Sequence, residues 1–330
     1  TASGHGAWEA AFVNLFEPGD TVLMPETGRF SRVWGEMGEA LGLEIVTVEN
    51  DWRTAIDPAT VEAALRADTE GKIKAVLMVH TETATGVTSD VQAVRRAMDA
   101  SGHSALLVVD AIASWLTTGL PMDDWGVDVV VAASQKGLML PPGLSFTAVG
   151  PKALEATKEC KTFREYWSWS ARLGFEQYRR FCGTAPEHMI FGLREAIEII
   201  GEEGLDNVFA RHDRHAEATR RAVQAWGLEV LCQEPRDYSS SLTAVMLPEG
   251  HDADAFRATV LANFDMSLGN GLSRLAGKVF RIGHLGDFND LMLTGTLSGV
   301  EMGLRVADIP HQSGGVQAAM QFLSESATAA

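Results

Sequence analysis

The sequence predicts an α/β protein with a mostly parallel central sheet, and two observations carry that prediction. Residues 1–150 alternate strand and helix patterns, which is typical of a parallel sheet covered by its crossover helices. Two apolar runs, residues 105–109 and 127–133, have the composition of strands buried on both faces, as parallel strands are. The rest of the chain mixes helices with separate strands, so we expect a smaller α+β domain at the C-terminus.

The predicted elements of the first part follow one another in regular order. Pro18-Gly19-Asp20 and Gly42 end two helices, and Asp57-Pro58 begins a third. Helices are expected at residues 7–16, 30–41, 57–66 and 90–100, and strands at residues 21–24, 44–49, 74–80, 105–109 and 127–133. Units of this kind connect right-handedly, so the loops after successive strands gather along one edge of the sheet.

The second part is less regular. A helix begins near Pro186 and ends at Gly201 or Gly204. A further long helix is expected at residues 208–226, and strands at residues 228–231, 241–247 and 278–282. We therefore predict a large domain over residues 1–203 and a small C-terminal domain over residues 204–330.

Composition and charge limit the partners. The 330 residues are 46% hydrophobic and 22% charged, as in ordinary globular proteins, and the net charge of −17 argues against a nucleic-acid-binding face. Three widely spaced cysteines, Cys160, Cys182 and Cys232, favour a reducing compartment over a disulfide framework or a metal site. No apolar run reaches the roughly 18 residues of a membrane span. We therefore expect a cytoplasmic protein with no nucleic-acid or membrane partner.

A lysine and an aspartate follow two of the predicted buried strands. Lys136, in Ser134-Gln135-Lys136-Gly137, comes just after residues 127–133, and Asp110 ends the other run. Open α/β sheets bind ligands beyond the carboxyl ends of their strands. A lysine is costly to bury there unless its amine does chemistry such as forming a Schiff base. A lysine for an aldehyde carbon and a carboxylate for a ring nitrogen are the pair that pyridoxal phosphate requires.

The segment Ser3-Gly4-His5-Gly6 lies just before the first predicted helix. Free N–H groups and the positive dipole end at such a start suit a phosphate, although a glycine-rich turn capped by Ser3 explains the pattern as well. Glu9 occupies the place of the third glycine of a dinucleotide fingerprint, and the sequence contains no G-x-x-x-x-G-K-[ST]. Because the chain starts at Thr1, without methionine and so close to this segment, we expect an N-terminal segment to precede it.

Three further positions carry polar groups whose roles stay open. Residues 80–87 contain hydroxyls that could bind a ring oxygen or a phosphate, or could simply form a polar loop. Arg281 interrupts an apolar strand, so its planar fork either binds a carboxylate or forms a surface ion pair. Thr184, before Pro186, is either a helix cap or a phosphate ligand. His284 is more consistent with a local hydrogen bond than with a general base.

Together these segments resemble the class V family of pyridoxal-phosphate-dependent aminotransferases, in particular its serine–glyoxylate and alanine–glyoxylate branch. The resemblance covers essentially the whole chain and rests on seven segments in the family's order. They are residues 3–11, 82–87, 109–111, 134–137, 141–144, 192–196 and 280–284. The resemblance implies the type I fold of pyridoxal-phosphate-dependent transferases, with a small C-terminal α+β domain.

The resemblance also implies how the cofactor ring is held. Lys136 would carry pyridoxal 5'-phosphate as a Schiff base, and Asp110 would pair with the pyridinium nitrogen. Thr83 would bond near the phenolic oxygen of the ring. Phe30 would stack on one face of the ring, and Ile112 would pack on the other.

For the phosphate, the resemblance implies a site shared between two subunits. The segment Ser3-Gly4-His5, through the backbone of its last two residues, and the side chain of Gln135 would hold the phosphate. Thr184 would reach the phosphate of the neighbouring subunit's cofactor, which makes the active unit a homodimer. Phe181 stands where the family usually has a tyrosine, so that hydroxyl contact is not expected.

The implied activity is the transfer of an amino group from a small L-amino acid, serine or alanine, to glyoxylate or pyruvate by a ping-pong mechanism. Arg281 would bind the substrate carboxylate, and the freed Lys136 would act as general base and acid. Aspartate is a second possible donor if Arg172, Arg179 or Arg180 supplies a second cation. A cysteine desulfurase on the same fold and a protein that binds the cofactor without catalysis also stay open.

Overall fold

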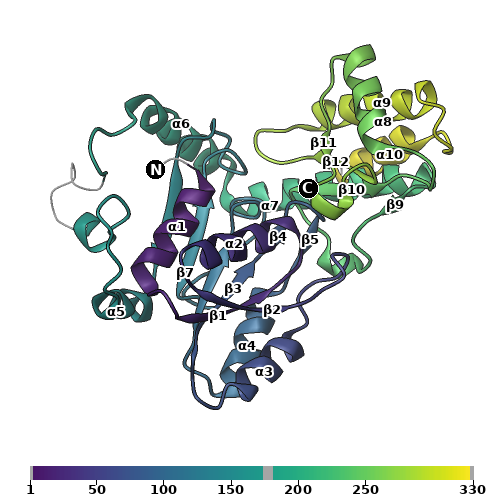
Figure 1. Cartoon of the computed structure of the whole chain (residues 1–330). Coiled ribbons are helices and arrows are strands. Elements are labelled where there is room, and N and C mark those ends of the chain that lie inside the picture. Colours follow the sequence, from purple (N-terminus) through teal and green to yellow (C-terminus); the bar gives the residue numbers. More distant parts are fainter. Residues whose placement is uncertain (1–2, 174–180, 328–330) are drawn as a thin grey trace.

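A six-stranded sheet forms the centre of the first part of the chain (Figure 1). In the computed structural model, which describes residues 3–173 and 181–327, the strands lie in the order β2-β1-β3-β6-β7-β8. Their bounds are β1 (Thr21–Pro25), β2 (Glu44–Val48), β3 (Ile73–Val79), β6 (Leu106–Asp110), β7 (Val129–Ala133) and β8 (Ser145–Val149). All neighbours pair in parallel except β7 and β8. The predicted α/β class with a mostly parallel sheet is confirmed.

Helices cover both faces of this sheet because successive side chains of a strand point to opposite faces. Val22 of β1 packs with Trp8 and Trp34 on one face, whereas Leu23 packs with Val61 on the other. The first face is covered by α1 (Gly4–Leu15), α2 (Arg29–Ala40) and α5 (Pro151–Glu159), and the second by α3 (Pro58–Ala67) and α4 (Val91–Ser101). In Figure 1, α3 and α4 lie together below the sheet.

The strand register gathers polar residues at one edge of the sheet. Asp110, the last residue of β6, pairs with Val79 at the end of β3 and with Val131 of β7. Lys136 is the third residue after the end of β7. A short hairpin of β4 (Thr81–Glu82) and β5 (Val87–Thr88) continues directly from β3. The carboxyl ends of three neighbouring strands therefore meet where the lysine and the aspartate stand.

The C-terminal part forms a separate antiparallel sheet with its own apolar core. The strands lie in the order β11-β12-β10-β9. The elements of this part are α7 (Leu205–Ala225), β9 (Glu229–Val230), β10 (Leu242–Met246), α8 (Ala253–Phe264), β11 (Gly269–Asn270), β12 (Val279–Gly283), α9 (Asp290–Val306) and α10 (Gly315–Ala327), with short 3₁₀ turns at Pro235–Asp237 and Ser273–Leu275. A 3₁₀ turn at Ser170–Arg172 and helix α6 (Glu187–Glu203) precede these elements, and α6 lies on the side of α1 in Figure 1. Its core joins Trp226, Phe256 and Phe280. A domain boundary at Gly204 stays a prediction.

The start of α1, strand β8 and helix α5, which had no predicted counterpart, differ from the sequence-based expectation. Helix α1 begins at Gly4 rather than Ala7, so the glycine segment is the first helical turn and not a loop before it. Ser3 occupies the N-cap position, but its side chain makes no capping hydrogen bond. The antiparallel strand β8 was not anticipated, because its partly exposed residues lack the apolar run that marks β6 and β7. Within the described ranges, no helix combines the length and apolarity that a bilayer crossing demands.

Candidate active site

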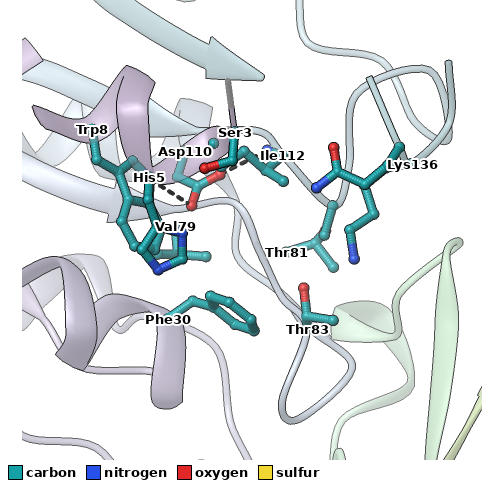
Figure 2. A pocket seen from close by; sticks show the side chains of 13 residues that line it. Ser3, His5, Trp8, Phe30, Val79, Thr81, Thr83, Asp110, Ile112 and Lys136 are labelled. Carbon is teal, nitrogen blue, oxygen red and sulfur yellow. Dashed lines mark hydrogen bonds between the residues drawn. The ribbon is translucent and has the colours of Figure 1, made fainter. Parts of the chain in front are cut away.

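A cavity of about 150 Å³ opens where β3, β6 and β7 end, beside the first turn of α1 (Figure 2). Its walls come from the N-terminal helix, the strand ends and the lysine loop. The lining residues are Ser3, Gly4, His5, Trp8, Phe30, Val79, Thr81, Thr83, Asp110, Ile112, Ala113, Gln135 and Lys136. The structure thus brings together nine of the residues that the sequence singled out, from five separate segments of the chain.

Asp110 lies at the base of the cavity and is almost fully buried. The indole Nε1 of Trp8 donates to its Oδ2 over 3.0 Å, and the backbone N–H of Ile112 donates to its Oδ1 over 2.7 Å. Burial raises the pKa of Asp110 to about 7, against the effect of these two donors and of the charge on Lys136. The charged form of this carboxylate is therefore costly until a cation faces it.

Lys136 projects into the cavity from the loop after β7, with its amine on the side of Thr83 (Figure 2). Ser134 shapes this loop, since its hydroxyl donates to the carbonyl of Pro141 over 2.8 Å. Gly137 is required because a Cβ there would lie 2.3 Å from the carbonyl oxygen of Trp115. Burial and the nearby charge of Arg281 lower the pKa of the Lys136 amine, while Asp110 opposes the shift. A larger share of this amine is therefore neutral and nucleophilic at a given pH than of an exposed lysine.

The first turn of α1 forms another wall. Gly4 packs so closely on Ile112 that a Cβ would lie 2.2 Å from its Cδ1. In the described part of the chain, no acceptor receives the backbone N–H groups of Gly4 and His5, whereas those of Gly6 and Ala7 bond the carbonyl of Ser3. Such free N–H groups at a helix start suit an anion. The side-chain oxygen Oε1 of Gln135 is also buried without a partner among the described residues, but it is an acceptor and calls for a donor rather than an anion.

Flat and apolar side chains close the sides of the cavity. Phe30, from the first turn of α2, meets Trp8 edge-on with ring centroids 6.3 Å apart. Burial and the neighbouring charge of Arg29 lower the pKa of His5, whose ring packs on Trp8 at 4.4 Å. The cavity walls thus offer one aromatic face opposite the aliphatic side chain of Ile112.

Arg281 stands on β12, next to this cavity rather than in its wall. Its Nη1 donates to the carbonyl of Thr83 and its Nε to the carbonyl of Asn270, each over 2.8 Å. Burial lowers the pKa of Arg281, against the charge of Glu82. No carboxylate of the described residues forms an ion pair with it, so this guanidinium keeps its charge available for an anion.

The structure separates the remaining expected residues from the cavity. Thr184 is exposed and does not line the cavity, and the N-cap of α6 is Pro186, so Thr184 does not cap that helix. Arg172 lines a different hollow, and Arg179 and Arg180 lie outside the described residues. His284 is buried with its Nε2 3.0 Å from the hydroxyl of Thr243, which confirms the local hydrogen bond.

The sequence reasoning missed Trp8, Val79, Thr81 and Ala113 as lining residues, and Glu82 behind them. Trp8 could have been found, because it follows Gly4 by one helical turn and so lies on the same face of α1. Thr81 lines the same cavity as Thr83, which follows it by two residues. Nothing in the sequence marks the position of Glu82 relative to α2, since that contact joins distant segments.

Comparison with known proteins decides the family. The model of the family "Aminotransferase class-V" matches residues 1–273. The chain belongs to the class V aminotransferases. It is 45% identical over 330 residues to the serine–glyoxylate aminotransferase of Methylorubrum extorquens, covering 98% of this chain and 82% of that one. It is 42% identical to the L-aspartate–glyoxylate aminotransferase of Paracoccus denitrificans, covering 100% and 83%. The crystal structure of the Bacillus subtilis ureidoglycine–glyoxylate aminotransferase superposes with a TM-score of 0.88 at 28% identity, covering 98% and 83%.

This class V aminotransferase is a pyridoxal-phosphate-dependent enzyme, and its cavity residues fit that cofactor. The buried Asp110 carboxylate, whose pKa burial raises to about 7, calls for a cation such as a protonated ring nitrogen. The amine of Lys136 has the lowered pKa that Schiff-base chemistry uses. The N–H groups of Gly4 and His5 suit a phosphate, and the NH₂ group of Gln135, which lines the same cavity, is a further donor.

Proposed function

We propose that this aminotransferase moves an amino group from a small L-amino acid, serine or alanine, to glyoxylate or pyruvate. The observation that carries the proposal is the gathering of Lys136, Asp110 and Arg281 around one cavity. Names of relatives support the substrate class, because those with 42–45% identity include serine–glyoxylate and aspartate–glyoxylate aminotransferases. Ping-pong kinetics are expected, since amino group and acceptor meet the site in separate halves of the reaction.

Pyridoxal phosphate, when bound, supplies an electron sink for the charge that develops at the substrate Cα. We assign Asp110 to hold its ring nitrogen protonated, and Trp8 to orient that carboxylate. Lys136 Nζ would hold the cofactor at rest and, once released, accept the proton from Cα as general base and pass it on as general acid. Phe30 and Ile112 would enclose the ring, with Thr83 near its hydroxyl. Arg281 would bind the substrate carboxylate.

The phosphate would lie at the start of α1. Ser3, Gly4 and His5 form this end of the helix, and the backbone N–H groups of Gly4 and His5 are the donors that it offers. Gln135 would add its side-chain amide from the lysine loop. The helix dipole favours the anion at this end. These roles rest on position and chemistry, and each is open to substitution.

Aspartate is the second candidate donor, because the Paracoccus relative at 42% identity is named for it. A second carboxylate would need a second cation, and Arg29 lies near enough to His5 to lower its pKa. Parallel assays with serine, alanine and aspartate would decide between them. A kcat/KM for aspartate above that for serine would replace the proposed donor.

We also propose a cytoplasmic homodimer. Helix α6 leaves Phe191, Ile197 and Ile199 exposed, and a second hollow beside α1 is lined by aromatic side chains including Trp167 and Trp169. Such a surface is typical of a covered interface. Thr184, exposed just before α6, would then approach the partner's cofactor. Light scattering at several concentrations tests the dimer, and a monomer that retains full activity would contradict it.

A cysteine desulfurase is disfavoured by the positions of the thiols. The Cys160 sulfur lies 3.4 Å from the carbonyl oxygen of Phe16, and Cys182 lines the second hollow. Burial raises the pKa of Cys232 to about 11, so it is a poor nucleophile. None of the three lines the cavity that contains Lys136.

The deciding experiment is an absorbance spectrum of purified protein incubated with pyridoxal phosphate, followed by addition of L-serine and then glyoxylate. The lysine-linked band should give way to the amine form with serine and return with glyoxylate. A band that stays unchanged on addition of any amino acid would identify a protein that binds the cofactor without catalysis. Absence of any band would overturn the proposed site.

A further inference from the structure

We propose that Glu82 is a positioning residue that fixes Phe30, Thr83 and Arg281 relative to one another. The proposal rests on the proposed function of that site, and it concerns a residue that does not line the cavity itself. Glu82 is fully buried at the end of β4, directly behind the wall formed by Thr81 and Thr83.

One oxygen of Glu82 caps helix α2. Its Oε2 accepts from the backbone N–H of Phe30 over 2.9 Å and from that of Ser31 over 3.2 Å. The N-cap residue of α2 is Gly28, which has no side chain to do this, and the Ser31 hydroxyl receives the N–H groups of Thr27 and Gly28. The carboxylate from the distant hairpin therefore supplies the acceptor and the negative charge that a helix start favours. Phe30, one of the two residues held, is the aromatic wall of the cavity.

The other oxygen of Glu82 holds the hairpin. Its Oε1 accepts from the backbone N–H of Ala84 over 2.9 Å, and the Glu82 carbonyl accepts from Gly86 over 2.9 Å. Thr83 lies between these bonds, so the direction of its carbonyl is fixed. That carbonyl is the acceptor for Nη1 of Arg281. The same carboxylate thus sets the aromatic wall through Oε2 and the orientation of the arginine through Oε1.

The fit around Glu82 leaves no room for a different arrangement. A Cβ on Gly28 would lie 2.3 Å from Cγ of Glu82, so this glycine lets the carboxylate approach the helix start. Only a carboxylate accepts on both ends, because a glutamine would direct its NH₂ group at one of the donors. Burial raises the pKa of Glu82 to about 7, with the charge of Asp110 adding to it, so a charged group here is unfavourable for stability alone. A group that disfavours stability and orients three functional residues points to a functional role.

The test compares Glu82→Gln with Asp128→Asn. Asp128 is a matched control, because it is also buried and does not line the cavity. Its Oδ2 accepts a hydrogen bond of 2.8 Å from the backbone N–H of Leu107. In titrations of the apo-protein, Glu82→Gln should weaken pyridoxal phosphate binding about tenfold, the loss expected when a hydrogen bond to a charged group is removed. The visible circular dichroism of the bound cofactor should also change. The Asp128→Asn variant should keep both properties, even where its melting temperature falls equally.

Kinetics then separate positioning from chemistry. In Glu82→Gln the KM values for the amino acid and the oxo acid should rise together by about tenfold, because both use Arg281, while kcat changes far less. Gly28→Ala, which displaces the carboxylate without removing it, should change cofactor affinity and KM in the same direction. Wild-type affinity and KM in Glu82→Gln, or equal losses in Asp128→Asn, would overturn the proposal. So would failure of both Glu82→Gln and Gly28→Ala to fold. If wild-type protein binds the cofactor but does not transaminate, the proposed function fails, and Glu82 is judged on affinity and dichroism alone.

Discussion

Two regions of the molecule treat carboxylates in opposite ways. At the cofactor cavity, Asp110 and Glu82 are buried with no ion-pair partner among the described residues, and burial raises the pKa of each to about 7. In the C-terminal part, the pKa of Asp290 is lowered. Partial burial acts to raise it, but the hydrogen bonds from Arg214 and His215 and their charges outweigh burial. In the first region Asp110 faces the cavity, where a bound cation can pair with it, and Glu82 bonds backbone N–H groups behind the cavity wall. In the second region the charge of Asp290 is neutralised by side chains of the protein.

The difference between the two regions shows that the buried carboxylates that cost stability lie at the cavity and not in the C-terminal part. Residues 203–215 and the start of α9 form a closed network, since Arg211 and Arg214 each bond a carboxylate through two nitrogens. Such paired groups support the fold when partly exposed. Asp110 and Glu82 gain no such pairing from the described residues, so we explain the burial of Asp110 by the ligand that it is to bind and that of Glu82 by the residues that it positions.

Replacement of Lys136 should have the largest effect on the cavity side of this comparison. Lys136→Ala removes the amine that we assign to the cofactor bond and to proton transfer, so transamination should fall by roughly four orders of magnitude. Borohydride reduction in the presence of pyridoxal phosphate should label the wild type covalently at this position, as mass spectrometry would show. Lys152→Ala is the matched control, because Lys152 bonds the carbonyl of Ala105 outside the cavity. Labelling of Lys136→Ala at another single lysine would refute the assignment.

Asp110→Asn should lower kcat by about a hundredfold or more, through loss of the charge that keeps the ring nitrogen protonated. It should also change the pH dependence of apo-protein stability. Burial raises the pKa of Asp110 in the folded state from its ordinary value of 3.8 to about 7, so between these two pH values the folded state binds more protons than the unfolded state. The free energy of unfolding therefore falls as pH rises through this window.

Denaturant titrations from about pH 4 to about pH 8 check this linkage. The wild-type apo-protein should lose stability with rising pH, and Asp110→Asn should lose less, with Glu82 supplying the remaining slope. Added pyridoxal phosphate should restore stability at high pH in the wild type. If the free energy of unfolding of the wild-type apo-protein rose with pH over this range, the raised pKa values of the carboxylates at the cavity would be contradicted.

Arg281→Gln should raise KM for the amino acid by about a hundredfold, because the substrate carboxylate loses a bidentate cation. Burial lowers the pKa of Lys136 and the charge of Arg281 lowers it further, so removing that charge should raise the pKa. The limb of the kcat profile that rises as the released Lys136 amine loses its proton should therefore move to higher pH. Arg257→Gln is the control, since Arg257 bonds the carbonyl of Leu268 and Asp254. An unchanged pH profile in Arg281→Gln would show that the charge of Arg281 does not affect the pKa of Lys136.

The sequence predicted the parts of the site that local patterns control. Apolar runs marked β6 and β7, so the polar residues after them, Asp110 and Lys136, could be placed at one sheet edge from those runs alone. Arg281 stood out because a charge in an apolar strand is unusual. The fold class followed from the same runs, since parallel sheets bury both faces of their strands.

Contacts between distant segments were beyond such patterns. The bond from Trp8 to Asp110 and the bonds from Phe30 and Ser31 to Glu82 join residues far apart in the chain, so no spacing predicts them. The first turn of α1 was predicted as a loop because glycine disfavours helices, whereas packing of Gly4 on Ile112 overrides that propensity.

Asp290→Asn should have the smallest effect on activity of these variants. It tests whether the paired carboxylates of the C-terminal part serve stability alone. The variant loses the ion pair with Arg214 and the charge at the start of α9, so the free energy of unfolding at neutral pH should fall by about 1 kcal/mol. Since the folded pKa of Asp290 is lowered, its stabilisation is present above the ordinary carboxylate pKa and is lost as pH falls below it. The stability gap to the wild type should therefore close in acid, the reverse of the Asp110 trend. Cofactor affinity and kcat should stay within about twofold of the wild-type values. A large loss of either would mean that the ion pairs of the C-terminal part also shape the cavity, so that the two regions do not have separate roles.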